Sequence, residues 1–260
     1  MAIVAVAVSL LGACGGSPTD SASGAPTPTP RLAPLTPRDP DRIAPEQKEA
    51  IAELAANASA VAPDPHAGHV GHDRPGPQGA DETGDLAAGD QIRFDEQWAR
   101  AGSAVPGLDS MGEATAAGYT RAAVQVAGIG VHWVNWTLIA APFDPTRPAM
   151  LLFDERGSTP ALVGFSYWVR SETEPGGFAG DRDVWHRHTN LCVVNGWIDR
   201  ESVPSRAECA GHVLAGSDLW MLHAWVVPDR ENRWGDFATH HPALCPSEVG
   251  TPDIVRCPTI

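Results

Sequence analysis

Apolar residues recur along the last two thirds of the chain in short runs with the two-residue period of β-strands. Val163, Phe165 and Tyr167 alternate with smaller or polar neighbours, as expected for a strand with one better-buried face. Runs rich in β-branched and aromatic residues, separated by Pro, Gly and Asp clusters, predict strands at 128–139, 149–154, 161–170, 184–194 and 219–227. Because no long helix intervenes, we expect an antiparallel β-sandwich or a small barrel.

Helical spacing is confined to the region before the first strand. Residues 45–57 open with proline and have one weakly apolar face, which predicts a short helix. A second helical stretch begins at Ile92, and Asp109 or Ser110 is expected to cap a third that runs to about Gly118. The predicted fold class is therefore mainly β with N-terminal helices (α+β).

Composition places the globular domain late in the chain. Half of the 24 prolines precede residue 91, and the first aromatic residue is Phe94, so the first third lacks the side chains that build a core. We expect a Ser/Pro/Thr-rich disordered tether at 15–44, a short helix and a flexible histidine-containing segment at 45–90, and a β-rich domain at 91–260.

Residues 1–14 are expected to be a signal peptide, because their apolar run is too short to span a bilayer. No basic residue precedes the run, so we expect the natural start to lie upstream of Met1. The run ends in Leu11-Gly12-Ala13-Cys14, which resembles the lipobox of bacterial lipoproteins. The resemblance implies that Cys14 carries lipid and that this anchor holds the protein at the extracytoplasmic face of the cell membrane.

A formal net charge of −14, with no local cluster of Lys or Arg, argues against binding to nucleic acid or to anionic head groups. Acidity favours cations as partners, although solubility of an exported protein explains it as simply. The chain indicates no protein partner.

Four cysteines remain after Cys14, and an even number in an exported protein predicts two disulfides. Three pairings are possible, and proximity along the chain favours Cys192 with Cys209 and Cys245 with Cys257. No Cys-x-x-Cys pair is present, which argues against a thiolate zinc knuckle or a thioredoxin-like redox centre.

Histidines within tryptophan-rich strands carry the candidate chemistry. His186 and His188 lie two residues apart, so a strand would point both to one side. His132 and His223 lie in two other predicted strands. Convergence of these imidazoles would suit zinc, copper or iron rather than calcium or magnesium, and we take zinc or copper as the expected ion. Alternatively, His and Trp fill a β-core with satisfied polar tips.

Further histidines extend this hypothesis. His240 lies in the loop after the last predicted strand and is a possible additional ligand or general base, or else a surface histidine. His66, His69 and His72 are separated by small residues and could capture a metal weakly. An indole N–H or a carboxylate could orient an imidazole through its second nitrogen, and the candidate carboxylates are Asp183, Asp218 and Asp236.

Several short motifs follow one another in a set order: Gly118-Tyr119, Gly130-Val-His132-Trp-Val-Asn135, Asp144-Pro-Thr-Arg-Pro148, Leu162-Val-Gly164, Leu222-His223-Ala-Trp225 and Gly235-Asp-Phe237. In this order they resemble an uncharacterised group of bacterial exported proteins over about residues 110 to 245. The resemblance implies a domain in that region and the choice of His132 and His223, and it adds no chemistry.

The order of His186, His188 and His223 is similar to the metal motif of cupin barrels. The glutamate expected after the pair is absent, since Leu191 and Cys192 occupy that region. We hold this resemblance as an analogy of architecture.

Three classes of function remain. The first is a metal-binding domain, and the second is a metal-dependent hydrolase or oxidoreductase with one open coordination position. No Gly-x-Ser-x-Gly, His-Glu-x-x-His or phosphate-loop motif supports other chemistries. The third is a binding module without metal, in which exposed tryptophans line a groove. Its candidates are Trp133, Trp136, Trp185 and Trp234.

Overall fold

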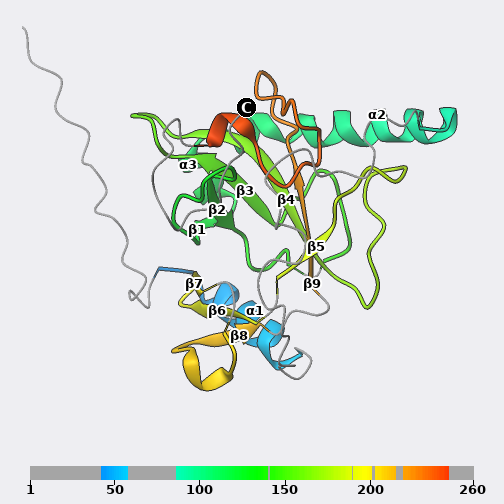
Figure 1. Ribbon diagram of the computed structural model, residues 1–260. Helices are drawn as coiled ribbons and strands as arrows, with labels where there is room; N and C mark the ends of the chain where they lie inside the picture. The colour runs from blue at the N-terminus through cyan, green and yellow to red at the C-terminus, as the bar shows by residue number, and fades with distance from the viewer. Residues whose placement is uncertain are drawn as a thin grey trace, which may run out of the picture. The chain divides into compact units, whose positions relative to one another are not determined.

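Six strands form the larger of two antiparallel sheets in the computed structural model, which describes residues 42–57, 86–139, 141–188, 190–200, 203–214 and 219–245. All of these residues belong to one compact unit, Leu35–Ile260. In spatial order the strands are β1 (Thr120–Arg121), β2 (Val131–Val134), β3 (Met150–Asp154), β4 (Ala161–Arg170), β9 (Leu219–Ala224) and β5 (His186–Arg187). The long strand β4 lies between β3 and β9 (Figure 1).

A smaller sheet contains β7 (Trp197–Arg200), β6 (Leu191–Val194) and β8 (His212–Leu214), in that order. Asn195 and Gly196 join β6 to β7 with positive φ angles of 49° and 74°. An Asn-Gly pair favours this two-residue hairpin turn because both residue types tolerate left-handed backbone. Helix α1 (Pro45–Ala56) packs against β8, as Figure 1 shows.

One face of the six-stranded sheet packs against α2 (Ala88–Ser103) through an aromatic core. Phe94 and Ala101 of this helix are buried in the same cluster as Phe165 and Tyr167 of β4. Phe94 also lies edge-on to Phe237, with ring centroids 6.0 Å apart. Alternation along β4 therefore sends its odd-numbered aromatic side chains into this cluster.

The opposite face carries two further apolar clusters. Met150, Trp168 and Met221 pack with buried residues of α1 and of the smaller sheet. Leu152 and Trp225 form the second cluster, with Ile129, Val163 and Leu244. The smaller sheet and α1 thus cover one part of this face, and Trp225 with its neighbours covers another.

These layers confirm the predicted fold class, mainly β with N-terminal helices, and they fit a sandwich of two sheets. The outer strands of the larger sheet are β1 and β5, and no pairing between them closes a barrel within the part of the chain that the structure describes. The cupin-like barrel is therefore not observed there.

The sequence predicted some strands well and missed others, since β1, β7 and β8 were not predicted. The strands predicted at 149–154 and 161–170 are β3 and β4, whereas β2 and β9 are shorter than expected. The single strand predicted at 184–194 is wrong, because it is two strands, β5 and β6, in different sheets. Asn190 has φ 56°, a left-handed conformation that ends the extended run.

One of the α-helices starts at a side-chain cap that the sequence offers. Ser110 accepts a hydrogen bond from the Glu113 main chain and begins α3 (Met111–Ala116), so Ser110 rather than Asp109 is the cap. Three short 3₁₀ segments complete the described helices: η1 (Val105–Gly107), η2 (Arg206–Glu208) and η3 (Pro242–Leu244).

Helix α1 is part of the globular core, although the sequence placed its residues before the domain. Ile51 and Leu54 are buried in the cluster that contains Met150 and Trp168. The Gln47 side chain accepts a hydrogen bond from the Trp136 main-chain nitrogen at 3.2 Å. The globular unit therefore begins before residue 91.

The predicted disulfide between Cys192 and Cys209 is present, with Cα atoms 5.5 Å apart. Cys245 is also disulfide-bonded, but its expected partner Cys257 lies outside the described residues, as do Cys14 and the tether histidines His66, His69 and His72. Among the residues described, no helix is long and apolar enough to cross a membrane.

Candidate metal centre

Strand register places three of the predicted histidines on one face of the larger sheet. His132 pairs with Leu152, which pairs in turn with Gly164. His223 pairs with Ser166, two residues along β4 from Gly164. His186 pairs with Met221, two residues before His223. Because directly paired residues and residues two apart share a face, His132, His186 and His223 all project from the same side.

The imidazole rings form a continuous series. Ring centroids of His132 and His223 lie 5.9 Å apart, those of His223 and His186 lie 5.2 Å apart, and those of His186 and His188 lie 5.3 Å apart. His240, which is fully buried, also acts electrostatically on His223. We call these five residues, His132, His186, His188, His223 and His240, the histidine cluster.

In three histidines of the cluster, the Nδ1 atom of the ring lies within 3.5 Å of an oxygen atom. The Nδ1 atom of His223 lies 3.0 Å from the Thr239 carbonyl oxygen, and since a carbonyl only accepts, Nδ1 carries the proton. His240 Nδ1 lies 3.0 Å from the Thr239 hydroxyl, and His186 Nδ1 lies 3.5 Å from the Val184 carbonyl oxygen. With Nδ1 protonated, Nε2 of neutral His223 carries the lone pair that a metal would bind.

Burial and neighbouring imidazoles keep His223 neutral. The pKa of His223 is lowered well below 6.5, first by burial and next by His132, with smaller contributions from His240 and His188, while the Thr239 hydrogen bond opposes the shift. The Nε2 atoms of His186, His188, His223 and His240 are all withdrawn from solvent. Neutral imidazole is the form that coordinates metal.

His241 lies beside the cluster but has a structural role. Its Nδ1 accepts a hydrogen bond from the Ala243 main chain at the start of η3, and its Nε2 lies 3.2 Å from the Arg230 carbonyl oxygen. Both ring nitrogens are therefore engaged by the main chain. Burial lowers the pKa of His241 as well.

Asp183 and Asp236, two of the three candidate carboxylates, have other neighbours in the described part of the chain. Asp183 lies near the main-chain nitrogen of Phe178 and the indole of Trp185, and Asp236 is influenced by Arg182. No hydrogen bond from a described histidine to either carboxylate is observed, whereas Thr239 and Val184 supply oxygen atoms instead. Asp218 lies outside the described residues.

Replacing Asp183 by asparagine is expected to stabilise the protein at pH 8 by roughly 1–3 kcal/mol. Burial raises the pKa of Asp183 to about 7, so the folded protein keeps a proton that the unfolded chain releases near pH 4. This contribution to stability is complete below the unfolded pKa and is lost as pH rises through 7. Asparagine resembles the protonated carboxyl, so the gain should vanish near pH 4 in urea unfolding.

Asp181→Asn is the matched control for this experiment, since Asp181 is an exposed residue of the same loop. It should leave stability unchanged at both pH values. A gain from Asp183→Asn that is equal at pH 4 and pH 8 would show that the Asp183 carboxyl is already ionised at low pH in the folded protein.

The histidine cluster is not closed around an ion as it stands. Among the described residues, no group of three His, Cys, Asp or Glu side chains is arranged to hold a metal. Two imidazoles bound to one tetrahedral zinc have ring centroids roughly 5 Å apart, given a Zn–N distance of about 2.0 Å. The observed separations of 5.2 to 5.9 Å are close to that value. We therefore expect metal coordination to require rotation of the rings rather than a large movement of the backbone.

The tryptophans do not form an exposed groove. Trp133, Trp136 and Trp185 are 8%, 0% and 8% exposed, so only Trp234 of the four candidates has substantial surface. The binding module without metal required all four to be accessible, and their burial argues against it.

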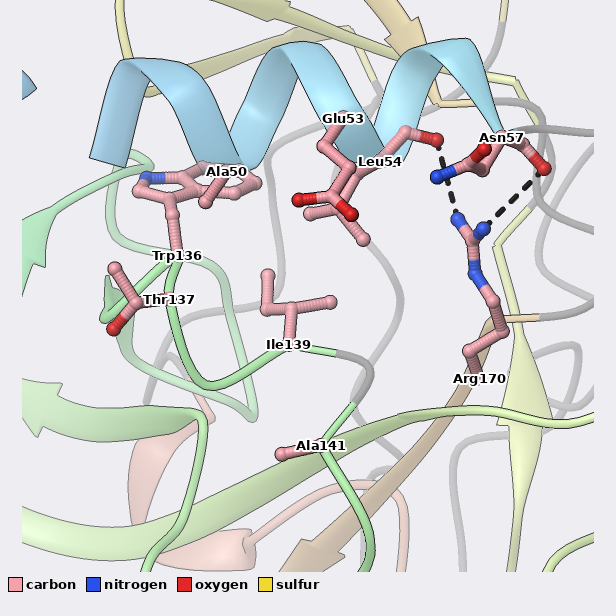
Figure 2. Close-up of a pocket in the computed structure, with 9 residues that line it drawn as sticks. All are labelled: Ala50, Glu53, Leu54, Asn57, Trp136, Thr137, Ile139, Ala141 and Arg170. Carbon is pink, nitrogen blue, oxygen red and sulfur yellow. Dashed lines mark hydrogen bonds between the residues drawn. The ribbon is translucent and has the colours of Figure 1, made fainter. Parts of the chain in front are cut away.

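A separate cavity of about 410 Å³ lies beneath α1. Figure 2 shows Trp136 and Ile139 below the helix, with Arg170 at its carboxyl end. Arg170 donates hydrogen bonds to the carbonyl oxygens of Leu54 and Asn57, at 3.1 and 3.3 Å, and so caps the last turn of α1. No histidine lines this cavity, which is therefore distinct from the histidine cluster.

Sequence reasoning identified all five members of the cluster but missed Thr239 and Ser166. Thr239 orients two rings by its position in a loop, and Ser166 lies opposite His223 only because of strand register. The Ser166↔His223 pairing has no signal in a single sequence.

Comparison with protein-family models, with curated proteins and with solved structures finds no match to this chain.

Proposed function

We propose that this chain is an exported, lipid-anchored protein whose β-domain binds a transition metal, zinc or copper. His132, His186, His188 and His223 are the proposed ligands, with His240 as an additional one. The observation that carries the proposal is the convergence of imidazoles from separate chain segments, with successive rings 5.2 to 5.9 Å apart.

A cation held between the rings would accept lone pairs from several neutral imidazoles at once. Borderline transition metals fit a site made of neutral nitrogen ligands.

The orientation of His223 supports the same conclusion. Histidines that bind metal commonly donate their second nitrogen to a carbonyl or carboxylate oxygen, which fixes the tautomer and the direction of the ring. The Nδ1 contact of His223 with the Thr239 carbonyl has this form. His132 and His188 are only partly buried, so the cluster borders on solvent.

The location rests on two features. The sequence Leu11-Gly12-Ala13-Cys14 resembles a lipobox, and the Cys192–Cys209 disulfide is of a kind that persists in oxidising compartments. Both support an extracytoplasmic, lipid-anchored protein.

Metal content of the purified full-length chain tests the proposal. After the protein is loaded with metal and desalted, we expect elemental mass spectrometry to find close to one zinc or copper ion per chain. The double variant His186→Ala/His188→Ala should lose it. His212→Ala removes an exposed imidazole of β8 and should retain the ion.

A triple variant, His66→Ala/His69→Ala/His72→Ala, separates the tether from the cluster and should also retain about one ion. The proposal is wrong if the loaded wild-type chain holds no metal, or if the triple variant rather than the double variant loses it.

A further inference from the structure

Ser166 lies in the middle of the sheet face that carries the histidine cluster. It pairs with His223 on β9 and with Met150 on β3, so its side chain shares the face of His223. The residue is fully buried. The side chains of Ser166 and His223 are therefore cross-strand neighbours on one face of the sheet.

The Ser166 hydroxyl has no hydrogen-bond partner among the residues that the structure describes. Met150, its pairing partner on β3, belongs to an apolar cluster and offers no strong hydrogen-bond acceptor. An unsatisfied buried hydroxyl destabilises a folded protein, and alanine would fill the same position without that penalty. A hydroxyl at this position is explained if it bonds to a group that arrives with the metal.

Charge indicates what kind of group that is. Among the described residues, the groups that shift the pKa of His223 are three imidazoles and the Thr239 main chain, none of which is anionic. Neutral imidazoles would leave the full charge of a divalent ion uncompensated in a buried setting. A small anion from solution would compensate it and would also accept a hydrogen bond from a hydroxyl.

We propose that the metal centre is open to an exogenous ligand, a small anion that coordinates the ion and accepts a hydrogen bond from Ser166. This inference rests on the proposed metal site and deepens it, because it distinguishes a ligand-binding centre from a closed storage site. His132 and His188, at the two ends of the series of rings, are only partly buried, so the cluster is not fully sealed from solvent.

Cobalt(II) and azide test this proposal on the full-length chain. Cobalt(II) gives the site a visible spectrum, and azide should change that spectrum in a saturable way. Ser166→Ala should weaken azide binding by about tenfold, as expected for loss of one hydrogen bond to a charged group, and should leave cobalt affinity within about twofold. Ser166→Thr keeps a hydroxyl and should bind azide more tightly than the alanine variant.

Ser103→Ala, which alters an exposed hydroxyl at the end of α2, is the control and should behave as the wild type. If cobalt binds but azide leaves the spectrum unchanged, or if Ser166→Ala binds azide as tightly as the wild type, the inference is overturned while the metal site stands. If cobalt does not bind at all, the proposed function fails together with it.

Discussion

Replacing His223 by alanine is expected to lower zinc affinity by at least roughly 100-fold, since even loss of a residue that only orients a ligand typically costs 10- to 100-fold. The ring centroid of His223 lies within 6 Å of those of His132 and His186, and His188 and His240 also act on it electrostatically. Its loss would leave no central ligand between β2 and β5. Isothermal titration of the metal-free protein with zinc measures the change directly.

Thermal or urea unfolding gives a second readout for this variant. An ion at 100 times its dissociation constant stabilises the folded protein by about 2.7 kcal/mol, and His223→Ala should abolish that increment. Without metal, the variant should be destabilised by about 1–3 kcal/mol, because the Thr239 carbonyl loses its donor. His212→Ala should reproduce the wild type in both measurements, and an unaltered zinc affinity in His223→Ala would remove this residue from the site.

Gly164→Val is expected to be the most disruptive single change near the cluster, lowering the free energy of unfolding by about 3 kcal/mol or more. A Cβ atom at position 164 would lie 2.9 Å from Cε3 of Trp225 and 3.1 Å from the Ala224 carbonyl oxygen. The indole cannot yield easily, because its Nε1 donates a hydrogen bond to the Ala238 carbonyl at 2.7 Å.

This substitution should also weaken metal binding, because Trp225 contacts the cluster. Its ring lies 6.0 Å from that of His223 and 5.0 Å from that of His241, so a displaced indole would disturb both. Gly176→Ala is the matched control, since a Cβ atom there meets nothing within 4 Å. Urea unfolding and zinc titration of both variants check the expectation, and a stable Gly164→Val protein with normal zinc affinity would contradict it.

The fold was largely predictable where a strand alternates along its whole length. β4 was predicted over its observed range because buried aromatics alternate in the sequence. β5 and β6 were merged because only residues 188–190 separate them, and the left-handed Asn190 has no distinct signal within a β-rich run. β7 was missed although Asn195 and Gly196 are a strong hairpin signal, because the strand itself is short and half polar.

The candidate site was predictable in its residues but not in its surroundings. His132, His186 and His223 stand out as histidines within apolar strands, and register then brings them to one face. The supporting atoms depend on which strands are neighbours, and that order is set by tertiary packing. The sequence offered carboxylates as orienting groups. In the structure, the main-chain oxygen atoms of Thr239 and Val184 lie beside the Nδ1 atoms of His223 and His186 instead.

X-ray absorption spectroscopy of the zinc-loaded His66→Ala/His69→Ala/His72→Ala protein tests the central claim most directly, because the tether can then contribute no imidazole. We expect at least three imidazole nitrogens in the first shell at about 2.0 Å. A first shell with fewer than three imidazoles, or one composed of oxygen or sulfur atoms, would contradict a metal centre built from the strand histidines.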